Sequence, residues 1–123
     1  RWAQGISDGK NYTGMKIYLN GDYNIKNSSV MVMTLSEKSG LIPLKGNLVY
    51  NLSKGTCTIG TVKYRNMASV AKSDGRTVVT LTIPQMLRPN VSDTTTFRAS
   101  STLSTFMDAN TGDYIPEFTV SVK

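Results

Sequence analysis

Apolar and polar side chains alternate along several short stretches of the chain, as they do in strands that bury one face. The clearest examples are Met15–Leu19, Arg76–Ile83 and Glu117–Lys123. Val30–Leu35 is a nearly continuous apolar run, which predicts a strand buried on both faces. No stretch of ten or more residues has a helical period, although a single helical turn fits Gln85–Leu87.

Turn signals separate these stretches. Ser73-Asp74-Gly75 predicts a tight hairpin, and Asn20-Gly21-Asp22 and Asp108–Asp113 predict further turns. Between Thr56 and Arg65 the alternation changes phase at Gly60, which predicts one long strand with a bulge.

Two weaker strands are expected around Leu48 and Tyr50 and within Thr95–Met107. The pattern therefore predicts an all-β fold of about seven to eight mostly antiparallel strands, arranged as a β-sandwich or a small barrel. No linker or repeat divides the chain, so residues 1–123 are expected to form a single β-sandwich domain.

The composition agrees with strands and argues against an enzyme. Serine and threonine supply 28 of the 123 residues, and threonine suits a half-exposed pleated surface. The chain has no histidine, which removes the commonest general base and the commonest metal ligand. Among the carboxylates only Asp108, Asp113 and Glu117 lie close together, in a spacing typical of turns. We therefore expect no catalytic residues, no metal site and no cofactor.

The net charge is +6, and its excess is unevenly distributed. No acidic residue lies between Glu37 and Asp74, so this stretch is a candidate basic face for nucleic acid, an anionic glycan or a membrane surface. The alternative is a set of solvated lysines that keep strand edges from pairing. The candidate basic residues are Lys45, Lys54, Lys63, Arg65 and Lys72.

Two single residues have more than one interpretation. Cys57 is the sole cysteine and is expected to be a small buried side chain, with a reactive thiol or an intermolecular bridge as alternatives. Trp2 either closes one end of the core or anchors an interface.

The chain has no run of about 18 apolar residues, so no membrane-spanning segment is expected. It begins at Arg1, which is expected of a mature secreted chain or of a piece of a longer protein. Four Asn-x-Ser/Thr motifs are weak signs of secretion. They begin at Asn11, Asn27, Asn51 and Asn90. An extracellular or cell-surface location is therefore expected.

A sandwich with regular strands can join copies of itself by backbone pairing. Met15–Leu19 and the C-terminal strand are the candidates for this role. Their apolar residues are Met15, Ile17, Leu19, Phe118, Val120 and Val122.

The chain end, Thr111-Gly112-Asp113-Tyr114 followed by Phe118–Val122, resembles the last two strands of bacterial chaperone–usher fimbrial subunits. The resemblance implies an incomplete immunoglobulin-like sandwich, completed by a strand from a neighbouring subunit. It also implies a polymer, an assembly chaperone and Arg1–Lys10 as the donor arm. That arm lacks the alternation of a donor strand, and one cysteine cannot form the disulfide common in these subunits.

Two alternatives remain open. The strand region of coat proteins from single-stranded RNA phages is resembled by Lys63-Tyr64-Arg65, Asp74-Gly75-Arg76, Val78–Pro84 and Phe97-Arg98. That resemblance implies a virion protein whose basic sheet binds nucleic acid, although those coats end in helices and this chain ends in a strand pattern. The other alternative is a monomeric domain that binds a glycan or a host receptor.

Overall fold

The computed structural model describes residues 5–8, 13–25, 29–36, 47–88, 98–103, 106–108, 112, 114–115 and 118–122. Within these residues the chain forms thirteen strands and one short 3-10 helix, η1 (Gln85–Leu87). The predicted all-β sandwich is confirmed. The helical turn predicted at Gln85–Leu87 is confirmed too.

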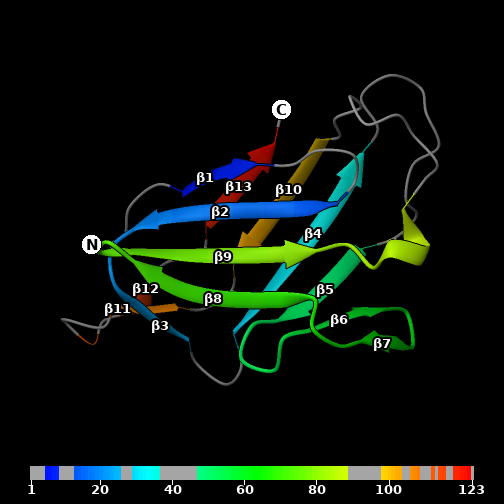
Figure 1. Cartoon of the computed structure of the whole chain (residues 1–123), viewed down its shortest axis with the longest axis horizontal. Helices are drawn as coiled ribbons and strands as arrows, with labels where there is room; N and C mark the ends of the chain where they lie inside the picture. The colour runs from blue at the N-terminus through cyan, green and yellow to red at the C-terminus, as the bar shows by residue number, and fades with distance from the viewer. Residues whose placement is uncertain are drawn as a thin grey trace.

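Two antiparallel sheets form the layers of the sandwich, and their strands run obliquely to one another (Figure 1). The first sheet has the order β1-β2-β9-β8. Its strands are β1 (Gly5–Asp8), β2 (Gly14–Asn20), β8 (Ala68–Ser73) and β9 (Arg76–Thr82). The second has the order β13-β10-β4-β5-β6-β7. Its strands are β4 (Val30–Ser36), β5 (Asn47–Asn51), β6 (Thr56–Ile59), β7 (Val62–Tyr64), β10 (Arg98–Leu103) and β13 (Phe118–Val122).

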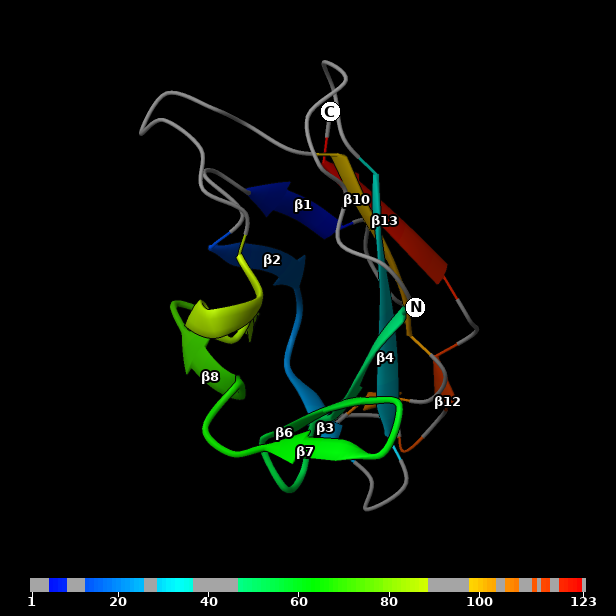
Figure 2. The ribbon, with the colours of Figure 1, turned by 90° about the vertical axis from the view of Figure 1, so that its right-hand side faces the viewer.

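A third, small sheet has the order β12-β11-β3 and lies at one end of the sandwich (Figure 2). It consists of β3 (Tyr23–Ile25), β11 (Phe106–Asp108) and β12 (Tyr114–Ile115). This sheet accounts for part of the excess over the seven or eight strands expected, and β1, β8 and the division of Thr56–Arg65 into β6 and β7 account for the rest. The chain bends at Gly21 and leaves the first sheet for the third. The stretch predicted as Thr95–Met107 likewise contributes both β10 and β11.

The core lies between the two main sheets and is built from the inward positions of alternating strands. Met15, Ile17 and Leu19 of β2 are at most 1% exposed. They face the second sheet, whose buried residues are contributed mainly by β4 and β5. Those residues include Met31, Met33, Leu48, Tyr50 and Cys57.

Two sequence predictions are wrong. The Val30–Leu35 run is not buried on both faces, because Met31 and Met33 are buried while Thr34 is exposed. An antiparallel sheet needs only one covered face, and β4 turns its other face outward.

The single long strand expected over Thr56–Arg65 is instead a hairpin, in which Ile59 pairs with Val62. Gly60 has a φ of 60° and Thr61 a negative φ, as a type II′ turn requires. A two-residue turn and a bulge both place a glycine at a change of phase, so the pattern alone did not separate them.

Candidate functional site

The strand predicted to offer an assembly edge at Met15–Leu19 is an interior strand. β2 pairs with β1 through Lys16–Leu19 and with β9 along its whole length. Both sides of β2 are therefore hydrogen-bonded, and Met15, Ile17 and Leu19 serve the core instead. β2 is therefore not an open edge in this arrangement, and its role in assembly stays a prediction.

β13 lies at an edge of the second sheet and pairs with β10. Val120 is 6% exposed, so the strand is anchored in the core at its centre. Phe118 and Val122 occupy the same face as Val120 by register, opposite Leu103 and Ala99. β1, the edge strand of the first sheet, lies beside β13 and closes this side of the sandwich.

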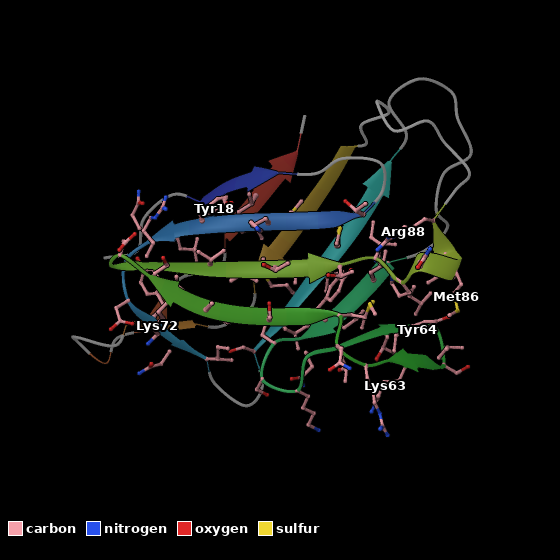
Figure 3. All side chains as sticks on the ribbon, in the orientation of Figure 1. Tyr18, Lys63, Tyr64, Lys72, Met86 and Arg88 are labelled. Atoms are coloured by element: carbon pink, nitrogen blue, oxygen red, sulfur yellow. The ribbon has the colours of Figure 1, made fainter. Side chains whose placement is uncertain are left out.

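The structure does not gather the predicted basic residues on one face. Lys63 is exposed on β7, and Lys54 and Arg65 are exposed near the same hairpin. Lys72 lies at the opposite end of the molecule, as Figure 3 shows. Lys45 and Trp2 lie outside the described residues, as do Asn11, Asn27 and Asn90.

Asn51, the fourth glycosylation candidate, serves a turn. Its Oδ1 accepts hydrogen bonds from Ser53 Oγ and from the Lys54 backbone N–H, both at 2.9 Å. These bonds shape the connection between β5 and β6.

A groove of about 230 Å³ opens where the β8–β9 hairpin meets the connection between β2 and β3. The hairpin closes on Asp74 and Gly75, with φ of 53° and 73°, which is a type I′ turn and confirms the predicted hairpin. The groove is lined by Asp22, Lys72, Ser73, Asp74, Gly75 and Arg76. We call these six residues the turn groove.

Charged side chains in the turn groove are held by specific partners. The Lys72 Nζ lies 2.5 Å from Asp22 Oδ1 and donates a hydrogen bond of 3.0 Å to Asn24 Oδ1. Asp22 Oδ1 is shielded from solvent, although the Asp22 side chain as a whole is 45% exposed. The Arg76 guanidinium lies 5.3 Å from the centre of the Tyr18 ring, within the range of a cation–π contact.

Thr77 supports the groove from below. Its side chain is fully buried, donates to the Gly21 carbonyl at 2.8 Å and accepts from the Tyr23 N–H at 3.0 Å. Both bonds join β9 to the bend between β2 and β3. The sequence suggested no role for Thr77, because its partners lie more than fifty residues away.

The sole cysteine has a buried, protonated thiol. Cys57 and Tyr50 are both fully buried and are register partners on β6 and β5. Burial raises the pKa of the Cys57 thiol, and its interaction with the neighbouring Tyr50 hydroxyl opposes the rise. Burial also raises the pKa of the Tyr50 phenol far above its ordinary value, and the Cys57 charge adds to that. Both groups are therefore neutral at pH 7, as the buried-side-chain interpretation of Cys57 expects.

No three His, Cys, Asp or Glu side chains of the described ranges lie together as a metal site. In the same ranges, no helix has the length and apolar character needed to cross a membrane. The chain matches no protein-family model, no curated protein and no solved structure.

Proposed function

We propose that this chain is a structural subunit that assembles with copies of itself through β-strand pairing, in the manner of a fimbrial subunit. The observation that carries the proposal is the position of β13. It is a regular five-residue strand at the edge of the larger sheet, and Val120 fixes it to the core. Within the described residues its pairing partner is β10 alone, and β1 lies beside its other side, so that side can accept a strand once β1 has moved away.

The neighbouring β1 supports this proposal. β1 has four residues and pairs with β2 from Gly5↔Leu19 to Asp8↔Lys16. A short edge strand loses few hydrogen bonds when it leaves a sheet, so another strand can replace it at modest cost. Release of β1 would open the edge of β2 as well as the side of β13 that β1 now covers.

The fimbrial resemblance extends the proposal in three respects. The subunit would be an immunoglobulin-like sandwich, it would be displayed at the cell surface, and a chaperone would hold its open edge before assembly. The virion alternative has less support, because Lys72 lies far from Lys63 and is paired with Asp22. A sheet that binds RNA needs its cations on one face.

Cross-linking between differently labelled chains tests strand exchange directly. Asp8 and Lys16 are register partners, and paired positions of this kind suit a disulfide. Chains carrying Asp8→Cys are mixed with chains carrying Lys16→Cys, unfolded, refolded together and oxidised. If β1 pairs with the β2 of another copy, the mixture yields disulfide-linked heterodimers. A mixture of Asp8→Cys and Lys63→Cys chains is the control, since those positions are not partners.

Electron microscopy and light scattering of the unmodified chain complete the test. Filaments or open-ended oligomers are expected, without nucleic acid absorbance. A stable monomer that forms no heterodimer in the mixing experiment would remove the proposal. Closed shells that carry RNA and lose it at high salt would favour the coat-protein alternative instead.

A further inference from the structure

The turn groove has the size of a site for one small ring. Its volume of about 230 Å³ lies below the roughly 300–1,000 Å³ typical of sites for drug-sized molecules. It also lies on elements that do not pair with β13, namely β8, β9 and the connection between β2 and β3. Strand assembly therefore leaves it open.

The charges that line the turn groove balance. Asp22 and Asp74 are acids, and Lys72 and Arg76 are bases. Lys72 is already neutralised by Asp22 at 2.5 Å. A ligand that carries a strong charge of either sign would meet an equal number of like charges, so the groove favours an uncharged polar molecule.

The residues that line the groove include both hydrogen-bond donors and acceptors. Lys72 and Arg76 donate only, while the carboxylates of Asp22 and Asp74 accept only. Adjacent hydroxyl groups on a ring both donate and accept, and they match carboxylate and guanidinium groups, which offer two atoms side by side. The groove thus contains both kinds of partner that a diol needs.

These side chains are held in place before any ligand arrives. The Tyr18 ring supports the Arg76 guanidinium, and Asn24 and Asp22 hold the Lys72 ammonium. The type I′ turn fixes the backbone at Asp74, and Thr77 fixes the Gly21 carbonyl beneath. Fixed partners lower the entropic cost of binding.

We propose that the turn groove binds one neutral saccharide residue through its hydroxyl groups. In this arrangement Arg76 and Lys72 donate to ring hydroxyls, and the carboxylates of Asp22 and Asp74 accept from them. A ligand of this size with few buried apolar atoms is expected to bind with a Kd of about millimolar order. This inference is independent of the proposed strand assembly.

Titration of the isotopically labelled chain with methyl glycosides, followed by NMR, tests the proposal. The panel contains neutral hexosides, N-acetylhexosaminides and hexuronic acid glycosides. Saturable shifts of the Asp22, Gly75 and Arg76 amides are expected with at least one neutral glycoside. The amides are followed by solution NMR where the chain is monomeric and by magic-angle-spinning NMR where it forms filaments, so either outcome for filament formation leaves this readout usable.

Two variants assign the binding to named groups. Asp74→Asn keeps a residue that tolerates the left-handed conformation but removes the carboxylate. Arg76→Gln removes the guanidinium from the Tyr18 ring. Each removes a charge-assisted hydrogen bond and is expected to weaken binding by about tenfold or more. Lys63→Gln, an exposed change on β7, is the matched control and leaves the affinity unchanged.

Three results would overturn the proposal. The first is the absence of saturable shifts at the groove amides with every neutral glycoside. The second is unchanged affinity when Asp74→Asn and Arg76→Gln are combined in a chain whose Tm matches that of the parent. The third is binding of uronic acid glycosides alone with competition by acetate, which would make the groove an anion site.

Discussion

Two hairpins of this molecule, β6–β7 and β8–β9, have two-residue turns but lie in different surroundings. β8–β9 belongs to the first sheet, and its β9 strand buries Thr77, Val79 and Leu81. β6–β7 ends the second sheet, and its Val62 is 50% exposed. The two hairpins thus have turns of the same length, but one contributes a strand to the core and the other forms an exposed edge of its sheet.

The difference arises at the base of each hairpin. β9 has partners on both sides, β2 and β8. β7 is paired to β6 alone within the described residues, and of the residues in β6 and β7 only Cys57 is fully buried. After β7 the chain crosses to the first sheet at Met67, whose N–H donates to Gly55 O at 2.8 Å and whose carbonyl accepts from Thr82 N–H at 2.7 Å. Substitutions in β8–β9 should therefore cost more than similar ones in β6–β7.

The largest effect is expected at Thr77 in β9. Thr77→Val keeps the shape but leaves the Gly21 carbonyl and the Tyr23 N–H without their partner. The free energy of unfolding should fall by about 2–4 kcal/mol, measured by urea denaturation. Thr80→Val, on the same strand but facing outward, should change it by less than about 0.5 kcal/mol. Equal effects at the two positions would contradict the assigned role of Thr77.

The two turn glycines should respond alike to alanine and differently to asparagine. A Cβ meets nothing within 4 Å at Gly60 or Gly75, so alanine costs only backbone strain, about 1–2 kcal/mol at each. Gly75→Asn should recover most of that cost, because type I′ turns accept asparagine in the left-handed region. Gly60→Asn should recover less, because the first position of a type II′ turn demands glycine. Thermal unfolding of the four variants measures this, and equal recovery would refute the different turn types.

High pH should lower the free energy of unfolding through Cys57 and Tyr50, which lie where the β6–β7 hairpin joins the second sheet. The pKa values of Cys57 and Tyr50 are raised in the folded state from ordinary values of 9.0 and 10.0. Above about pH 9 the unfolded chain loses these protons while the folded chain keeps them, so the free energy of unfolding falls as pH rises.

Tyr50→Phe should make the fall above pH 10 shallower. It should also cost about 1 kcal/mol at pH 7, because the Tyr50 hydroxyl no longer donates to Thr82 O, a bond of 2.8 Å. Urea unfolding at pH 7 to 11 gives both quantities, with Tyr64→Phe as a control on β7. An unchanged slope in Tyr50→Phe would mean that its phenol does not carry this dependence.

The smallest effect is expected at the exposed end of β6–β7. Val62→Thr changes a half-exposed side chain on an edge strand, and threonine also favours strands. The free energy of unfolding should shift by no more than about 0.5 kcal/mol in denaturant titrations. A loss as large as that of Thr77→Val would mean that β7 is covered by a partner.

Local signals predicted the fold class well. Ser73-Asp74-Gly75 predicted the β8–β9 hairpin because positive φ at both central residues has a clear residue preference. β8 itself was not predicted. Only Ala68 and Val70 are even half-buried in it, so its sequence barely alternates.

The sequence did not predict which strands are edges or where the turn groove lies, because both depend on residues that are far apart along the chain. Whether β2 is interior is decided by β9, which lies more than fifty residues further along the chain. The pairing of Asp22 with Lys72 spans fifty residues and likewise leaves no local pattern. Charge alone placed Lys72 in a basic face, and only the fold gave it an acidic partner.

The fixation of Gly21 by Thr77 also bears on how such a protein can diversify. The backbone beneath the turn groove is held by a buried residue that does not line the groove. Asp74 and Arg76, by contrast, are exposed and can be replaced at little cost to folding. The chemistry that lines the groove can therefore change by substitutions at these two positions, while Thr77 keeps the Gly21 backbone beneath it in place.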